Sequence, residues 1–521
     1  MPPTKGVCVR KIALAATSIV LSVGLFWPTQ AFAIDNVNTK KLRKAVTVSG
    51  ILQHERAFQR IANENDGTRA SGTPGYTASA NYVVKKLRKA GYKVKRQTFT
   101  FPFFDELAPA ELSELTPTAR DIETATFTYS GSGTVEGQVI PTNDIQIPPG
   151  DEPSSSNSGC EAADFPAAPS GDAIALIQRG TCTFEDKVTN ARAAGYEAVI
   201  IFNEGQPGRQ ELLTGTLGTP QSTPTIGISF DDGADLYAEA QAGTLTARVV
   251  TSTVNEDRKT QNIIADSPKG KIKGQTIVVG AHLDSVTAGP GINDNGSGSA
   301  TILEIAEQLA KLKYTKKLQR QVRFAFWGAE ELNLLGSQYY VDSLTEAQRA
   351  KIYANLNFDM LGSPNYVRFV YDGDGSATPD DPDDAGPPGS DAIEKIFVDY
   401  FKSKGLASEP TPFDGRSDYG PFIAEGIPAG GLFSGAEGIK TPEEAAIYGG
   451  TAGVAYDKCY HQACDTINNL NSKALSELGD AAAHATLVLA LSKTGLYPDG
   501  SRHADVKVTG KAAKRSFKLA S

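Results

Sequence analysis

The chain has 521 residues, a formal net charge of −9 and a pI near 5.3. This acidic balance argues against nucleic acid or an anionic membrane surface as the main partner. At roughly 150 residues per domain, a chain of this length is expected to form two or three domains.

The first 33 residues have the three-part pattern of a signal peptide. A basic stretch precedes an apolar run at 12–26, which is shorter than the roughly 20 residues that a membrane-spanning helix needs. Ala31-Phe32-Ala33 then matches the small-x-small pattern that a signal peptidase cuts after. No later segment is apolar enough to span a membrane. We therefore expect a secreted, extracellular protein without a membrane anchor.

Four cysteines remain once Cys8 is removed with the signal peptide. An even number in an oxidising compartment favours disulfides. Sequence proximity pairs Cys160 with Cys182 and Cys459 with Cys464. A tetrathiolate zinc site would need close C-x₂-C pairs, which are absent from the sequence.

The region 34–116 begins an α/β domain. Residues 73–91 predict a helix, with Pro74 in the first turn and Gly91 just after the end, and residues 92–101 alternate like a strand. Composition then changes over 117–253, where lysine is scarce. This region contains a strand–helix–strand pattern at 173–178, 184–194 and 198–202. We interpret 117–253 as an inserted domain.

Strand-like and helix-like segments alternate after the insertion. The predicted strands are Thr276–Gly280, Gln321–Trp327 and Ile352–Asn357, and the predicted helices are Ala300–Leu312, Ala392–Lys404 and Ser472–Leu491. This order predicts a mixed, mostly parallel sheet covered by helices on both faces, formed by 34–116 together with 254–498. Residues 499–521 are expected to be a mobile tail.

Histidines and carboxylates follow several of these strands or lie among glycines, where functional residues gather in such sheets. The candidates are His282, Asp284, Asp294, Glu330, Glu331, Asp359 and His461. This nitrogen and oxygen donor set suits zinc, with manganese or cobalt as substitutes. Five ligands, one of them shared, could hold two ions and leave a further carboxylate as a base. Each residue alone has an ordinary explanation as a cap or a surface charge, so the prediction depends on their joint occurrence.

These segments resemble the motifs of the secreted bacterial two-zinc aminopeptidases, of streptomycete leucine aminopeptidase and aminopeptidase Y type. The matching stretches are Ala281-His-Leu-Asp-Ser, Asn293-Asp-Asn-Gly-Ser-Gly, Trp327-Gly-Ala-Glu-Glu, Asn357-Phe-Asp-Met, Gly415-Arg-Ser-Asp-Tyr-Gly-Pro-Phe, Gly430-Gly-Leu-Phe and Cys459-Tyr-His. The insertion resembles a protease-associated domain, most clearly at 174–184. The resemblance implies a zinc exopeptidase fold from about Gly50 to Leu496.

The resemblance also implies roles for individual residues. Asp294 would bridge two zinc ions, with His282 and Asp359 completing one site and Glu331 and His461 the other. Glu330 would be the general base, Asp284 would orient His282, and Tyr460 would stabilise the oxyanion. Arg416 and Phe433 would line the substrate pocket. The peptide bond Asp294–Asn295 is expected to be cis, and Tyr419 departs from the histidine more usual at its position.

The sequence thus predicts an aminopeptidase, expected to be a monomer, that acts on peptides with free N-termini and prefers apolar first residues such as leucine. Three alternatives share the fold: a one-zinc glutaminyl cyclase, a glutamate carboxypeptidase and a non-catalytic receptor-like binding protein. A complete ligand set with an intact base argues against the first and the third. The short segment after Asn471 argues against the second. The histidines at 54, 484 and 503 match no motif, and we interpret them as structural or surface residues.

Overall fold

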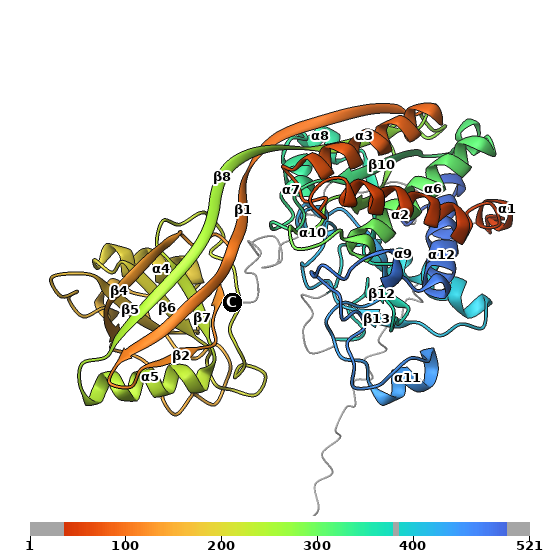
Figure 1. The fold of residues 1–521 in the computed structure, drawn as a ribbon. Coiled ribbons are helices and arrows are strands. Elements are labelled where there is room, and N and C mark those ends of the chain that lie inside the picture. Colours follow the sequence, from red (N-terminus) through yellow and green to blue (C-terminus); the bar gives the residue numbers. More distant parts are fainter. Residues whose placement is uncertain (1–35, 379–384, 498–521) are drawn as a thin grey trace, which may run out of the picture. The chain divides into compact units, whose positions relative to one another are not determined.

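A computed structural model of the protein describes residues 36–378 and 385–497. The predicted signal peptide, the predicted tail and His503 lie outside these residues. The strands are β1 (Lys93–Thr116), β2 (Arg120–Ile122), β3 (Ala125–Thr126), β4 (Gly133–Pro141), β5 (Ala173–Gln178), β6 (Ala198–Phe202), β7 (Thr225–Ile228), β8 (Thr246–Asp266), β9 (Thr276–His282), β10 (Gln321–Trp327), β11 (Ile352–Phe358), β12 (Phe369–Tyr371), β13 (Glu409–Thr411) and β14 (Ala429–Phe433). The helices are α1 (Lys40–Arg43), α2 (Val48–Asn63), α3 (Pro74–Lys89), α4 (Phe184–Ala193), α5 (Phe230–Ala242), α6 (Gly298–Lys311), α7 (Leu335–Asp342), α8 (Glu346–Arg349), α9 (Ser390–Ser403), α10 (Gly420–Ala424), α11 (Pro442–Tyr448) and α12 (Ser472–Leu491) (Figure 1).

The centre of the larger sheet is parallel. Its strand order is β13-β12-β14-β11-β9-β10-β8, and β14, β11, β9 and β10 all run in the same direction. Strand β9 lies between β10 and β11, the next two strands in the sequence. The chain therefore leaves β9 first to one side and later to the other, which creates a crevice at the carboxyl ends of these strands.

Both faces of this sheet are buried. Along β9, Ile277, Val279 and Ala281 point to one face, in the core formed with α2, α3, α6 and α12. Val278 points to the other face, where it packs with Trp327 and with Phe422 of α10. Because successive strand residues alternate between faces, a strand covered on both sides reads as a continuous apolar run. The predicted two-faced α/β sheet is confirmed.

Strands β1 and β8 form a long antiparallel pair, from Lys93↔Asp266 to Thr116↔Thr246. Strand β8 also pairs with β10 at one end and with β4 at the other, so it joins the two sheets into one continuous 14-stranded sheet. The second sheet has the order β8-β4-β5-β6-β7-β3, with α4 against one face and α5 against the other. The strand–helix–strand pattern predicted in the insertion is present as β5, α4 and β6.

The expectation that no segment after the signal peptide is apolar enough to span a membrane is wrong by composition. Helix α12 has the length and mean hydropathy of a membrane-crossing helix, as the only one in the described part of the chain. Its 18-residue apolar window is 72% buried inside the fold. It packs against α1, α2, α6 and α9 in the core. Its composition is therefore explained by its burial.

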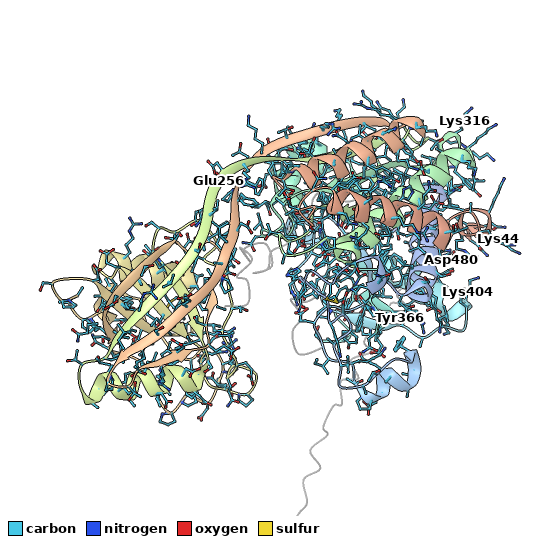
Figure 2. All side chains as sticks on the ribbon, in the orientation of Figure 1. Lys44, Glu256, Lys316, Tyr366, Lys404 and Asp480 are labelled. Atoms are coloured by element: carbon cyan, nitrogen blue, oxygen red, sulfur yellow. A yellow bond between two sulfur atoms is a disulfide. The ribbon has the colours of Figure 1, made fainter. Side chains whose placement is uncertain are left out.

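His54 and His484 have structural partners, as interpreted from the sequence. His54 is buried, and its Nε2 atom lies 3.5 Å from Glu304 and 3.4 Å from Glu307. The Nδ1 atom of His484 bonds the Thr39 hydroxyl at 2.8 Å, which ties the segment before α1 to α12. Burial lowers the pKa of His484 to about 4, and the nearby cations Arg43 and Lys404 add to the shift (Figure 2 labels Lys404).

This depressed pKa predicts an acid-sensitive fold. Below about pH 6.5 the unfolded chain protonates His484, whereas the folded chain does not until about pH 4, so the free energy of unfolding falls across that window. In metal-free protein, His484→Gln should remove about 1–2 kcal/mol of the stability loss between pH 7 and pH 4.5. Urea unfolding at both pH values measures this. His54→Gln is the opposite-sign control, because Glu304 and Glu307 outweigh burial and raise the pKa of His54. Equal pH slopes in wild type and His484→Gln would contradict the prediction.

Candidate metal centre and active site

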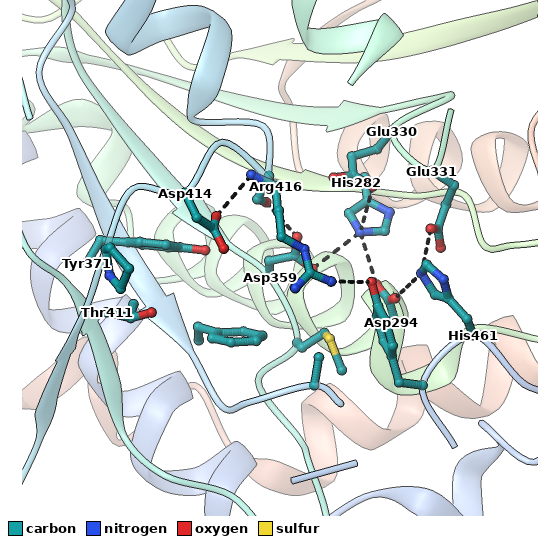
Figure 3. A pocket seen from close by; sticks show the side chains of 16 residues that line it. His282, Asp294, Glu330, Glu331, Asp359, Tyr371, Thr411, Asp414, Arg416 and His461 are labelled. Atoms are coloured by element: carbon teal, nitrogen blue, oxygen red, sulfur yellow. Dashed lines mark hydrogen bonds and ion pairs between the residues drawn. The ribbon is translucent and has the colours of Figure 1, made fainter. Parts of the chain in front are cut away.

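Four of the candidate residues lie at or just beyond the carboxyl ends of adjacent parallel strands. His282 is the last residue of β9, Asp359 directly follows β11, and Glu330 and Glu331 follow β10 after a short turn. The register places Trp327, the last residue of β10, opposite His282. Because these strands are parallel, their carboxyl ends meet at one edge, and the four side chains converge there (Figure 3).

Asp294 comes from the glycine-rich turn before α6, whose backbone is closely packed. A Cβ atom on Gly291, which has φ 58°, would lie 2.3 Å from the Asp294 carbonyl oxygen. A Cβ on Gly298 would lie 2.3 Å from the Asn295 side chain. That side chain accepts from Gly298 N and Met360 N, which ties the turn to the end of β11. The peptide bond Asp294–Asn295 is cis, as the resemblance implied.

His461 lies in a small loop that the disulfide Cys459–Cys464 closes. Its φ is 56°, and the Tyr460 ring stacks on the imidazole with a centroid distance of 3.8 Å. The structure also contains the disulfide Cys160–Cys182, in the insertion. Asp465, immediately after the loop, accepts hydrogen bonds from the backbone N–H groups of Asn293 and Asp294. The His461 loop and the Asp294 turn are therefore fixed against each other.

The donor atoms form two groups that share Asp294. In one group, His282 Nε2 lies 3.2 Å from Asp294 Oδ1 and 3.3 Å from Asp359 Oδ1. In the other, His461 Nε2 lies 3.2 Å from Asp294 Oδ2 and 2.9 Å from Glu331 Oε2. Glu330 belongs to neither group, and its Oε2 atom lies 3.7 Å from His282 Nε2.

This arrangement fits metal ions. The Nδ1 atom of His282 lies 3.2 Å from the Asp284 carbonyl oxygen, so Nδ1 carries the proton and Nε2 turns a lone pair toward two carboxylates. Asp359 Oδ1 and Glu331 Oε1 are buried and accept no hydrogen bond from any residue that the structure describes. Lone pairs facing one another in this way are stabilised when a cation lies between them.

The pKa values reflect the same excess of negative charge. Burial would lower the pKa of His461, but Glu331 and Asp294 outweigh it and raise the value to about 11. Burial would also lower the pKa of His282, but Glu330 and Asp359 outweigh it and raise the pKa. Burial raises the pKa of Glu330 well above its ordinary value, and His282 offsets part of the shift. The carboxylates around both imidazoles therefore favour positive charge in this cleft.

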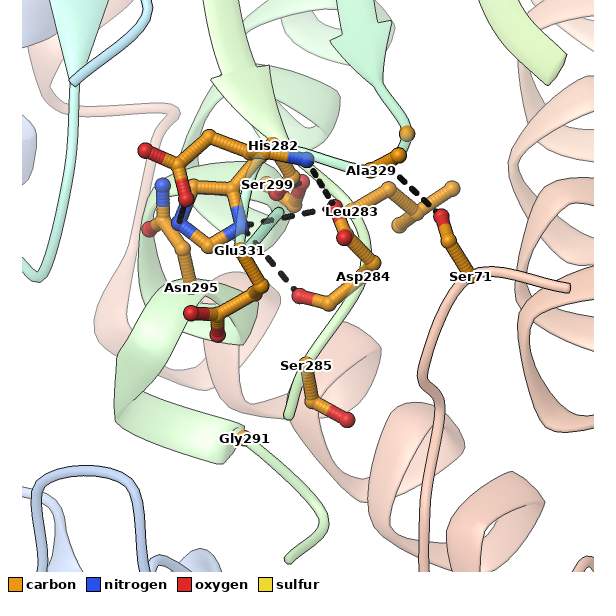
Figure 4. A network of polar contacts seen from close by, with 12 residues as sticks. Ser71, His282, Leu283, Asp284, Ser285, Gly291, Asn295, Ser299, Ala329 and Glu331 are labelled. Carbon is orange, nitrogen blue, oxygen red and sulfur yellow. Dashed lines mark hydrogen bonds and ion pairs between the residues drawn. The ribbon is translucent and has the colours of Figure 1, made fainter. Parts of the chain in front are cut away.

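Asp284 contacts His282, but mainly through its backbone. The Asp284 carbonyl oxygen is the hydrogen-bond partner of Nδ1, whereas the carboxylate oxygen Oδ1 lies 3.7 Å away (Figure 4). Oδ1 instead accepts from the backbone N–H of Glu330 at 3.4 Å. The carboxylate therefore lies between the His282 ring and the turn that carries Glu330.

Sequence reasoning missed three residues that support the cluster. Ser417 donates to Asp359 Oδ2 at 2.5 Å, and it lies inside the quoted Gly415-Arg-Ser-Asp motif, which was the available signal. Asp465 follows Cys464 and had no signal beyond that position. Arg69 is fully buried and donates to the carbonyl oxygens of Leu283, Pro290 and Gly291. It lies more than 200 positions away in sequence, in a loop without a motif.

The metal-ligand candidates open into a pocket that also contains Tyr460, Arg416 and Phe433. Arg416 donates to Glu437 at 2.7 Å and to the Tyr460 hydroxyl at 3.3 Å. The Phe433 ring stacks on Phe369 with centroids 5.9 Å apart. The predicted catalytic and substrate-binding residues therefore all face one cavity.

The histidine–carboxylate cluster lies at the switch point of an α/β sheet, in a domain that a second, smaller domain interrupts in sequence. These features define a metal-dependent hydrolase. Two family models match the chain: peptidase family M28 over residues 262–486 and the PA domain over residues 135–236. The chain is 47% identical to an aminopeptidase of Pseudomonas aeruginosa over 87% of its own length and 82% of that protein. It is 39% identical to a probable leucine aminopeptidase 2 of Aspergillus fumigatus, over 89% and 87% of the two chains.

Two solved structures agree with this assignment. An aminopeptidase from Aneurinibacillus sp. strain AM-1 superposes with a TM-score of 0.68 at 25% identity, covering 88% of this chain and 97% of that one. A zinc aminopeptidase from Bacillus subtilis superposes with a TM-score of 0.59 at 28% identity, covering 86% and 95%. The chain belongs to the aminopeptidases of peptidase family M28 and carries an inserted PA domain. It is a metallo-aminopeptidase.

The shared donor Asp294 predicts unequal effects on metal content. His461→Ala should remove about half of the bound zinc, because it breaks only one of the two donor groups, whereas Asp294→Ala should weaken binding in both groups. Elemental analysis of dialysed protein measures the ratio, and His484→Ala, outside the cluster, is the matched control. A His461→Ala protein that retains wild-type zinc would show that His461 is not a ligand.

Proposed function

We propose that this enzyme uses two zinc ions to hydrolyse the first peptide bond of peptides with free N-termini. The observation that carries the proposal is the pair of donor groups sharing Asp294, with Glu330 in the same pocket, 3.7 Å from His282 and belonging to neither group. His282, Asp294 and Asp359 would hold one ion, and Asp294, Glu331 and His461 the other. Each ion would then have three protein ligands and room for substrate or water.

Bound zinc would supply Lewis acidity toward the scissile carbonyl and the attacking water. Glu330 takes a proton from that water as it attacks and later delivers the proton to the leaving amine. Its position suits both tasks, because the carboxylate lines the same pocket as the candidate ligands and lies 3.7 Å from His282. The backbone hydrogen bond from Glu330 to Asp284 keeps the carboxylate next to the ligands.

Tyr460 would donate its hydroxyl proton to the oxyanion of the tetrahedral species, a contribution of roughly 2–4 kcal/mol for such a donor. Support comes from Arg416, whose guanidinium donates to the same hydroxyl oxygen at 3.3 Å. A phenol that accepts a hydrogen bond from a cation is a stronger donor of its own proton. The stack on His461 keeps the phenol beside the ligands.

The preference for the first residue follows from the pocket. Carboxylates near the metals would hold the substrate's ammonium group, which restricts cleavage to the first bond. Phe433, Met360 and Tyr371 provide apolar wall area for a side chain such as leucine. The fungal relatives named leucine aminopeptidase 2 are consistent with this choice.

We infer further that the enzyme is exported with cleavage after Ala33 and acts as a monomer. The signal-peptide pattern at 1–33 supports export. N-terminal sequencing of the extracellular protein and light scattering of the purified enzyme test the two statements.

Glu330→Gln should retain both metals and lose turnover by about 10²–10⁴-fold, because the amide cannot accept the proton of water. Release of p-nitroaniline from leucyl-p-nitroanilide, alongside elemental analysis, measures both properties. Glu346→Gln, an exposed glutamate on α8, is the control. A fully active Glu330→Gln enzyme would refute the base assignment. Wild-type protein that binds zinc without releasing p-nitroaniline would instead favour one of the alternatives predicted above.

We propose that the inserted domain shades the cleft and limits the length of accepted peptides. Leu332, one residue after Glu331, packs against the cluster of the inserted domain that contains Phe127 and Tyr129. The insertion therefore contacts the turn that carries the proposed base.

Excision of residues 107–252 tests this role. Glu106 and Thr253 are paired in register, so an Asn-Gly turn can join them as a hairpin. The excised enzyme should still cleave leucyl-p-nitroanilide, which shows that the catalytic domain is folded. Because a steric barrier is lost, the ratio of kcat/KM for decapeptides to kcat/KM for dipeptides should rise by about threefold or more. An unchanged ratio would rule out shading.

A further inference from the structure

The pocket contains one carboxylate that the proposed mechanism does not use. Asp414 lines it together with Tyr371 and Thr411, on the side opposite Asp294 and His461 (Figure 3). The apolar side chains of Phe433 and Met360 also line the pocket. The pocket therefore combines the candidate metal ligands, apolar wall area and, on the side opposite Asp294 and His461, an acidic group.

Asp414 is held in one position. Its Oδ1 atom accepts from the Tyr419 hydroxyl at 2.7 Å and from the backbone N–H of Arg416 at 3.0 Å. Tyr419 is itself fully buried, and its ring meets those of Tyr371 and Phe413 at centroid distances of 4.6 and 4.8 Å. Its hydroxyl also accepts from Gly415 N at 3.0 Å. Tyr419, the residue that departs from the family pattern, thus fixes the orientation of Asp414.

The Asp414 carboxylate is not paired with a cation among the residues that the structure describes. Both of its hydrogen bonds are made to Oδ1. The neighbouring cation Arg416 directs its guanidinium to Glu437 and Tyr460 instead. Oδ2 of an exposed, fixed carboxylate is left to bind a cation that enters the pocket.

We propose that Asp414 binds the cationic end of a lysine or arginine side chain at the first position of the peptide. The enzyme then cleaves basic as well as apolar first residues, an inference that rests on the proposed aminopeptidase function. The aliphatic stem of such a side chain packs against the walls that hold leucine, while the charged end stays hydrated near the rim. Tyr419 acts as a positioning residue through its hydrogen bond to Asp414.

The test compares kcat/KM for lysyl-, norleucyl- and leucyl-p-nitroanilide. Norleucine has the straight stem of lysine without the ammonium group, so the lysyl-to-norleucyl ratio isolates the charge. Asp414→Asn should lower this ratio about three- to tenfold, the range expected for a partly solvated ion pair. Tyr419→Phe should lower it less, because the backbone hydrogen bond from Arg416 remains. In wild type the ratio should fall as ionic strength rises, and in Asp414→Asn it should not.

Asp399→Asn, an exposed aspartate on α9, is the matched control and should leave the ratio and the activity unchanged. A ratio that stays within twofold of wild type in Asp414→Asn overturns the proposal, as does a wild-type enzyme that cleaves leucyl- but not lysyl-p-nitroanilide. Equal losses on all three substrates also overturn it, since Asp414 would then act on the common part of the substrate. Wild-type protein inactive on every substrate refutes the proposed function itself.

Discussion

Mutual repulsion among carboxylates in one buried cleft is the constraint that the rest of the structure depends on. Four carboxylates lie at the same sheet edge: Asp294, Glu330, Glu331 and Asp359. Burial raises the free energy of an ionised carboxylate, and each neighbouring negative charge raises it further. A chain free to relax would separate them. Two imidazoles and, in the proposed enzyme, two cations provide the attraction that keeps the group together.

The fold opposes the repulsion by fixing backbone rather than side chains. His282 and the acidic residues start from strands whose pairing leaves little freedom, and the Asp294 turn is held from two directions. Arg69 binds three carbonyl oxygens before the turn, and Asp465 accepts two N–H groups within it. Hydrogen bonds between charged groups and the backbone are stronger than neutral ones and exclude alternative loop conformations. The positions of the candidate ligands are therefore set by backbone contacts.

The insertion does not disturb this rigid centre, because the chain enters it along β1 and leaves it along β8, which form one antiparallel pair. Strands β1 and β8 extend from the edge of the catalytic sheet into the second sheet, so each sheet keeps a complete hydrogen-bonded ladder. The apolar side chains of the two sheets form separate hydrophobic cores. The second domain can thus contact Leu332, beside the proposed base, without contributing a ligand.

The amino-acid sequence by itself determined the central strands, the long helices, the family and the list of candidate ligands. Strand Gln321–Trp327 and helix Ser472–Leu491 were predicted to the residue, because burial on two faces and helical periodicity leave a local pattern. Only the tertiary structure decided that β1 continues to Thr116, that the Asp284 backbone meets His282, and that Ser417, Asp465 and Arg69 support the cluster. A pairing partner, a carbonyl acceptor or a buried counter-charge is supplied by residues distant in sequence. Such contacts leave no periodicity in the segment that receives them, so they exist only once the chain has folded.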